Sequence, residues 1–102
     1  MNNKILSLLG FCSKAGKMSY GMNNTVEALK RGVSKLTIAA ADTSDKSKKE
    51  LIFHAKKYGI ESLVLELTAD ELSHAVGFRC SVLSVNDKGF ADAIMKNGET
   101  TH

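Results

Sequence analysis

Hydrophobic side chains recur along this chain at two alternating spacings, one typical of helices and one typical of strands. Ile5, Leu8, Leu9 and Cys12 follow the three- and four-residue spacing of a helical face, which predicts a helix over residues 3–15. Alternation of polar and apolar residues predicts a very short strand over residues 17–20, and short apolar runs predict strands over residues 35–41, 62–67 and 81–85. Helical spacing returns between and after them, over about residues 23–31, 45–58, 69–76 and 88–96.

Capping residues and glycines mark the ends of these elements. Thr68 and Glu71 have the spacing of a capping box, in which each side chain satisfies the other residue's backbone N–H. We expect Asn23, Asn24 or Thr25 to cap the helix over residues 23–31, with Gly32 ending it. In the helix over residues 45–58, the side chains expected to face inward are Leu51, Ile52 and Ala55.

The alternation of strands and helices predicts one domain over residues 1–102. We expect an α/β fold, a three-layer α/β/α sandwich with a small mixed sheet of about four strands. The polar tail over residues 97–102 is expected to fray.

The charge is unevenly distributed and indicates an anionic partner. The net charge is only +3, but residues 1–40 contain six basic side chains and one acidic side chain, Glu27. The rest of the chain has a slight excess of acidic side chains. A solvated basic face without a ligand is the alternative explanation.

Residues for catalysis, metal binding or membrane insertion are sparse. Cys12 and Cys80 form no CxxC pair, and His54 and His74 lie on separate predicted helices without a nucleophile. Asp42 follows a strand, where a catalytic residue could lie, but an Asp there is more often a helix cap. We predict a protein that is not an enzyme and that has no cofactor and no metal. No apolar run approaches the ~18 residues that span a bilayer, so no membrane partner is expected.

Two stretches remain as candidates for ligand binding. The first is the start of the helix over residues 23–31, where Gly21 precedes two amide side chains and Lys30 and Arg31 follow in the last turn. The second is the loop over residues 77–81, where Phe78 could support an unstacked base and Arg79 could pair with phosphate. The alternative for Phe78 is that it plugs the core.

Five segments of the chain, taken together with their order and spacing, resemble the kink-turn-binding ribosomal-protein family, particularly its bacterial YlxQ-type branch. The family pattern Gly-x-Asn-Glu-x-x-Lys-Ala resembles the segment from Gly21 to Gly32, and the other matches lie over residues 8–17, 36–42, 70–77 and 86–91. The resemblance implies an α/β/α sandwich that binds a kink-turn, a sharply bent RNA helix with a bulge and tandem G·A pairs.

The resemblance also implies a role for individual residues. Asn23 and Asn24 would read guanine edges, and Gly21 would allow close approach of the backbone. Basic side chains would meet phosphates, namely Lys17, Lys30 and Arg31. The loop would cover the bulge with Phe78, Arg79, Cys80 and Ser81.

Two positions depart from the family pattern. Asn24 stands where the family has Glu, so the hydrogen bond to guanine has no charge to strengthen it. Glu27 stands where the family has Lys, so an anion faces the phosphates. On the amide-bearing helix start and the basic first 40 residues, we still predict a cytoplasmic, monomeric protein that binds structured RNA, with no DNA partner. The alternative is a protein-interaction module on the same fold whose RNA site has degraded.

Overall fold

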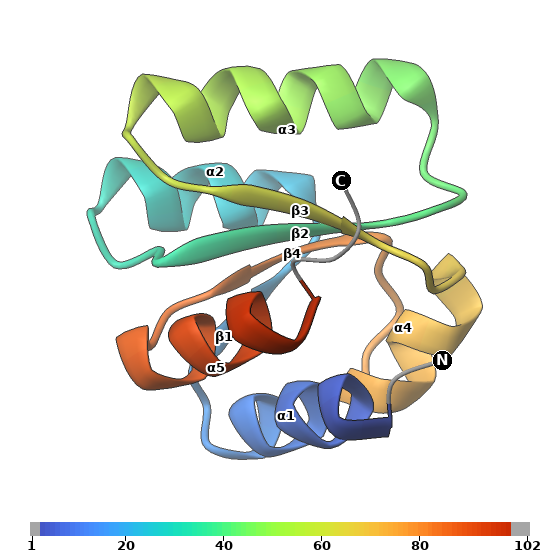
Figure 1. Ribbon diagram of the computed structural model, residues 1–102. Helices are drawn as coiled ribbons and strands as arrows, with labels where there is room; N and C mark the ends of the chain where they lie inside the picture. The colour runs from blue at the N-terminus through green and yellow to red at the C-terminus, as the bar shows by residue number, and fades with distance from the viewer. Residues whose placement is uncertain (1–2, 99–102) are drawn as a thin grey trace.

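A four-stranded mixed sheet lies between two layers of helices (Figure 1). The computed structural model describes residues 3–98. The elements in chain order are α1 (Asn3–Lys14), β1 (Met18–Tyr20), α2 (Met22–Lys30), β2 (Leu36–Ala40), α3 (Asp45–Lys57), β3 (Ser62–Leu65), α4 (Ala69–Val76), β4 (Val82–Val85) and α5 (Lys88–Gly98). The predicted three-layer α/β/α sandwich with a four-stranded mixed sheet is confirmed.

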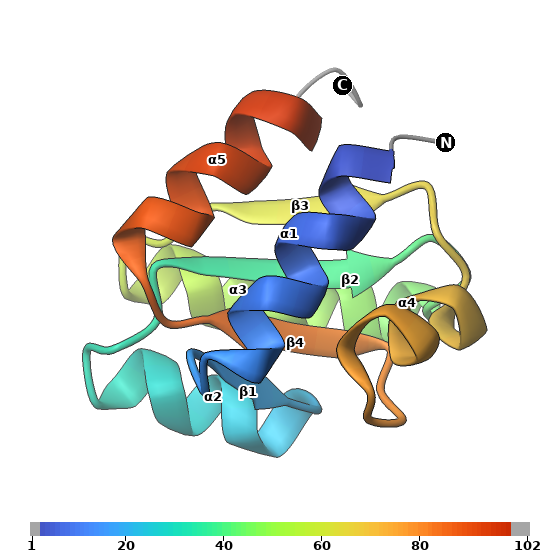
Figure 2. The same cartoon turned by 90° about the horizontal axis from the view of Figure 1, so that it is seen from below.

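The strand order is β1-β4-β2-β3, with β4 antiparallel to both neighbours and β2 parallel to β3. Helices α2 and α3 cover one face, whereas α1 and α5 cover the other, with α4 beside α1 at one end of the sheet (Figures 1 and 2). Every residue of β2 and β4 is buried because these central strands have neighbours on both sides and helices on both faces.

The core consists of two hydrophobic clusters, one on each face of the sheet. The larger cluster includes Leu9, Ile38, Leu72, Leu83 and Ile94, and holds α1, α4 and α5 against the strands. The smaller cluster joins Ala39, Leu51 and Val82, with Met22 and Val64 packed against it. The first residue of α2 therefore packs against the cluster that also holds α3.

The capping box of α4 is confirmed in full. Thr68 Oγ1 accepts from the Glu71 N–H at 3.1 Å, and Glu71 Oε1 accepts from the Thr68 N–H at 2.9 Å. Asp42 is also a cap, but of a helix distant in the sequence. Its Oδ1 accepts from the N–H of Ala69, the first residue of α4, at 2.8 Å. Gly77 ends α4 in the left-handed conformation, at φ 82°.

Three details of the predicted elements were wrong. Ile52 is 40% exposed, because it lies at the margin of the inward stripe that Leu51 and Ala55 form. No side chain caps α2, whose N-cap is Gly21. Helix α5 continues through Gly98, two residues into the tail expected to fray; the remainder of that tail lies outside the described residues.

One end of the sheet gathers segments that are distant in the sequence. Tyr20 pairs with Leu83, and Ala39 pairs with Val82, so the end of β1, the end of β2 and the start of β4 lie together. The start of α2 follows the end of β1, and the loop over residues 77–81 precedes β4. The start of α3 follows the end of β2 after residues 41–44. Within residues 3–98, no helix has both the length and the apolarity that crossing a membrane requires.

Candidate nucleic-acid interface

Helix α2 begins with exposed backbone donors. Gly21, at φ 87° and ψ 162°, adopts a conformation that favours glycine, and its N–H donates to Val82 O at 2.7 Å. Within the described chain no side chain caps this helix, so the first-turn N–H groups after Gly21 are not satisfied by a cap. Because no first-turn residue is acidic, the positive end of the helix dipole is not neutralised locally.

The amide of Asn24 is oriented by the backbone. Its Nδ2 donates to Tyr20 O at 2.9 Å, a carbonyl that can only accept, so the amide nitrogen must face it. This arrangement leaves Asn24 Oδ1 as an acceptor at the exposed helix start. The expectation that Asn24 caps the helix was wrong, because its amide bonds backward to β1.

A groove of about 250 Å³ runs between β1 and α2. Asn24, Glu27 and Arg31 recur at three- and four-residue spacing and line it from the helix. Met18, Ser19 and Tyr20 line it from the strand. Asn23 and Lys30 are exposed on α2, each one residue before a residue that lines the groove. Lys17 is exposed just before β1. The structure therefore brings Glu27 together with Asn24 and Arg31, and leaves Lys17 outside the groove lining.

Tyr20 joins the start of α2 to the loop over residues 77–81. Its ring lies 4.4 Å from that of Phe78, centroid to centroid, at an interplanar angle of 30°. Its hydroxyl lies 2.5 Å from Ser13 Oγ, which donates to Val76 O at 2.6 Å. Since Ser13 has one hydroxyl proton, the Tyr20 hydroxyl donates to Ser13. Phe78 is 57% exposed, so the alternative that it plugs the core is wrong.

The loop over residues 77–81 is anchored by hydrogen bonds at its C-terminal end. Ser73 Oγ accepts from the Cys80 N–H at 2.9 Å, and the Ser81 carbonyl accepts from the Ala40 N–H at 2.8 Å and from Thr43 Oγ1 at 3.2 Å. Anchoring leaves Phe78 and Arg79 exposed. A hollow of about 350 Å³ lies against them, lined also by Asp70, Ser73, His74 and Gly77.

Cys80, predicted as a contact residue, has its side chain in the core and is 8% exposed. A direct side-chain contact from Cys80 to a ligand is therefore excluded in this conformation. Burial raises the pKa of its thiol, and burial followed by the Asp87 carboxylate raises the pKa of the Cys12 thiol to about 11. Both thiols are protonated at neutral pH, so neither is an activated nucleophile.

Several residues that organise the candidate interface were missed from the sequence. Tyr20, Ser13 and Ser73 were not assigned a function, although each fixes one part of the loop or the helix start. An aromatic residue directly before the Gly21 turn was the only available signal. Asp42 is engaged as a cap, and no cluster of three metal-ligating side chains occurs within residues 3–98.

Solved structures show which class of protein has this architecture. A Bacillus halodurans protein of unknown function superposes with a TM-score of 0.87 at 29% identity, covering 93% of this chain and 96% of that chain. The Giardia lamblia 15.5kD RNA binding protein, at 20% identity, shares the fold, with a TM-score of 0.76 over 95% of this chain and 90% of its own. The class is a small, single-sheet α/β/α protein.

The particular family follows from sequence comparison. The model of the Ribosomal protein L7Ae/L30e/S12e/Gadd45 family matches residues 3–95, and the chain belongs to this family. The large ribosomal subunit protein eL30 of Candida glabrata is 36% identical over 88 residues, which cover 84% of each chain. The RNA-binding protein YlxQ of Enterococcus faecium is 27% identical over 88 residues, or 86% of this chain and 84% of its own. The predicted family is confirmed, and because it is a family of ribosomal proteins, so is the prediction of a non-enzyme.

Proposed function

We propose that this chain is a ribosome-associated, cytoplasmic RNA-binding protein that recognises a kink-turn or a related bent RNA with G·A pairs. Two relatives support the RNA partner by name, since eL30 is a protein of the large ribosomal subunit and YlxQ is an RNA-binding protein. The basic first 40 residues support an anionic partner by charge.

The contact between Tyr20 and Phe78 is the main support for this proposal. It places the uncapped start of α2 and the exposed aromatic loop side by side, as one surface. A bent RNA offers two features at one point, a widened groove with exposed base edges and an extruded nucleotide. A surface with hydrogen-bonding groups on one side and an aromatic ring on the other is complementary to both.

Each exposed group has a role in this complex. Asn24 Oδ1, oriented by Tyr20 O, accepts from a guanine N–H, and Asn23 provides a second amide. Phe78 stacks on the extruded base, with Arg79 and Ser81 beside it. Arg31 and Lys30, with Lys17 farther away, neutralise phosphates.

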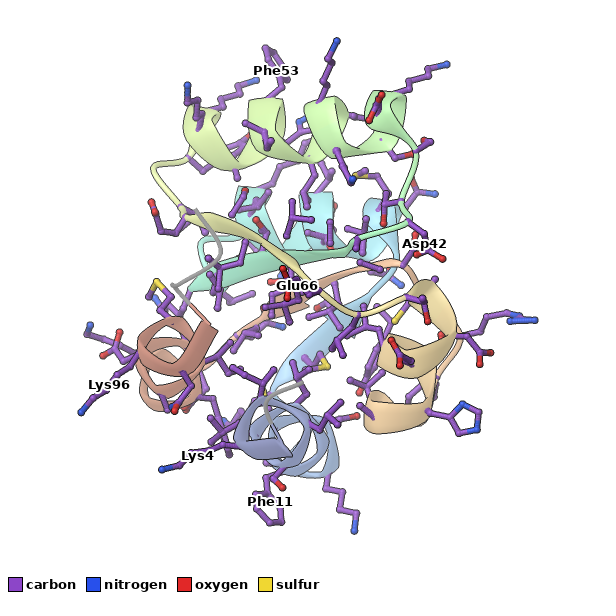
Figure 3. All side chains as sticks on the ribbon, turned by 45° about the vertical axis from the view of Figure 1, so that its right-hand side comes forward. Lys4, Phe11, Asp42, Phe53, Glu66 and Lys96 are labelled. Carbon is purple, nitrogen blue, oxygen red and sulfur yellow. The ribbon has the colours of Figure 1, made fainter. Side chains whose placement is uncertain are left out.

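Two matched aromatic substitutions test this surface. Phe78→Ala removes the ring that stacks on the base, and we expect affinity for a kink-turn RNA to fall about tenfold or more. Phe11 is the control, since it is 61% exposed, close to the 57% of Phe78, and points away from the sheet on α1 (Figure 3). Equal affinity of the Phe78→Ala and Phe11→Ala variants would refute the proposed surface.

The second candidate function is a protein-interaction module whose RNA site has degraded. The presence of Glu27 in the same groove as Asn24 and Arg31 favours it, because a carboxylate there repels phosphate. This alternative predicts that the purified protein retains no RNA, seen as an ordinary ratio of absorbances, and gives no mobility shift with total ribosomal RNA.

A further inference from the structure

The outer face of α3 combines an exposed aromatic ring with lysines. Phe53 is 64% exposed and projects from the helix on the side away from the sheet (Figure 3). At 100° per residue, four exposed lysines share its side of the helix, and we call this set the lysine face: Lys46, Lys49, Phe53, Lys56 and Lys57. Glu50 is the one acidic side chain in this sector, so the face is strongly basic.

The lysine face takes no part in the hydrophobic packing that holds α3 to the sheet. Leu51 and Ala55, on the opposite side of α3, are 1% exposed and hold the helix to the sheet. Lys48 lies outside the face and donates to Ala41 O at 2.8 Å. Phe53 contacts His54 edge to face, with ring centroids 5.3 Å apart, which leaves the outer surface of its ring open. A large exposed ring among cations has no evident role in folding.

The start of α3 adjoins the proposed RNA surface. Thr43 Oγ1, two residues before this helix, donates to the Ser81 carbonyl of the loop at 3.2 Å. Met22, the first residue of α2, packs against the cluster of Ala39, Leu51 and Val82. Helices α2 and α3 begin at the same end of the sheet and cover the same face (Figure 1). The lysine face therefore extends from the end of the sheet where the RNA surface lies.

We propose that the lysine face binds a single-stranded segment that continues from the RNA held by α2 and the loop. This inference rests on the proposed function and extends its footprint. From Lys46 to Lys57 the face spans about 16 Å along the helix axis, long enough for several phosphates. The exposed ring selects single-stranded RNA over duplex, because a base must be unpaired to stack on Phe53.

An anionic membrane is the other partner that lysines and an aromatic ring could suit. A helix that binds in the plane of a membrane needs a broad apolar face free to enter the lipid. In α3 that face is in the core, and the exposed apolar side chains are Ile52 and Phe53. The observations therefore favour nucleic acid, and vesicles serve as a competing arm of the test.

Tryptophan fluorescence tests the inference directly, because the chain contains no tryptophan. Phe53→Trp places one fluorophore on the lysine face, and Phe11→Trp places a matched one on the opposite side of the molecule. Each variant is titrated with a kink-turn RNA and with the same RNA extended by about ten unpaired nucleotides at either end, within single-strand site sizes. We expect the extended RNA to quench the fluorescence of the Phe53→Trp variant, with little effect on the Phe11→Trp variant.

Removing two positive charges from the lysine face gives a second test, measured as the affinity for the extended RNA and its dependence on salt. Lys49→Ala with Lys56→Ala should lower affinity for the extended RNA about tenfold, and should reduce the salt slope by about 0.7 for each phosphate that is no longer neutralised. The kink-turn RNA without the unpaired extension, called the trimmed kink-turn below, should bind this variant nearly as well as it binds the wild type. Lys14→Ala with Lys96→Ala is the control, since it removes the same charge from the helices α1 and α5, on the other face of the sheet.

The outcomes separate this inference from the proposed function. If the trimmed kink-turn binds but the extension neither quenches Phe53→Trp nor adds affinity, the lysine face is overturned and the proposed function stands. If the trimmed kink-turn does not bind, the proposed function fails and this inference fails with it. If vesicles of phosphatidylglycerol and phosphatidylcholine shift the Phe53→Trp emission and the extended RNA does not, the face is a membrane contact.

Discussion

The side chains of Asn24 and Glu27 set the chemistry of the groove between β1 and α2. Asn24 donates to Tyr20 O and presents a neutral oxygen as an acceptor. Glu27 adds a carboxylate to the groove that Arg31 also lines. Hydrogen bonds to a charged acceptor are stronger than those to a neutral one, and a carboxylate repels phosphate. At the scale of single residues, this groove should bind RNA more weakly than one with the opposite charge at position 27.

Reversing that charge should strengthen binding. Glu27→Lys replaces the repulsion with an attraction, and we expect affinity for a kink-turn RNA to rise about tenfold at low salt, with a smaller gain at high salt. Fluorescence anisotropy at two salt concentrations measures it. Glu61→Lys makes the same change in net charge at an exposed position next to β3, which is the edge strand opposite to β1. An equal gain from Glu61→Lys would show that only net charge matters.

The loop over residues 77–81 and helix α4 form one structural unit. Ser73, on α4, bonds the backbone of Cys80, and Tyr20 supports Phe78 from β1. The helix itself is stabilised separately, at its start, by the capping box of Thr68 and Glu71. At the scale of elements, the position of the loop and the stability of the helix therefore depend on different residues.

Two substitutions in this unit should separate binding from stability. Ser73→Ala leaves the Cys80 N–H without its partner, and Thr68→Ala removes the helix cap, so each should lower the free energy of unfolding by about 1 kcal/mol. Urea denaturation measures this loss. We expect Ser73→Ala alone to weaken RNA binding, because it releases the loop that carries Phe78. A parallel loss of binding in Thr68→Ala would mean that general destabilisation is the cause.

For the whole molecule, the order and type of the elements could be predicted because local chemistry encodes them. The capping box at Thr68, the glycines after α3 and α4, and the buried run of β2 each depend on neighbouring residues. The same holds for the motif around α2. The family that this motif resembles is the one whose model matches the chain.

The parts that could not be predicted depend on contacts between distant segments. Tyr20 meets Phe78 only because β1 pairs with β4, and Asp42 caps α4 only because β2 and β3 run parallel. The family resemblance assigned Cys80 to the loop that covers the bulge, whereas the tertiary fold turns its side chain into the core. The sequence therefore indicated both halves of the proposed RNA surface, whereas the contact that joins them depends on the tertiary fold.

The two halves act as one surface only if the RNA presents both its G·A pairs and its bulge together. The most direct measurement is a titration of the protein with a kink-turn RNA, and with the same RNA whose G·A pairs are changed to Watson–Crick pairs. We expect clearly tighter binding of the kink-turn, by about tenfold or more, at moderate salt. Equal affinity for the two RNAs, with the same steep loss as salt increases, would contradict specific recognition and leave only phosphate binding.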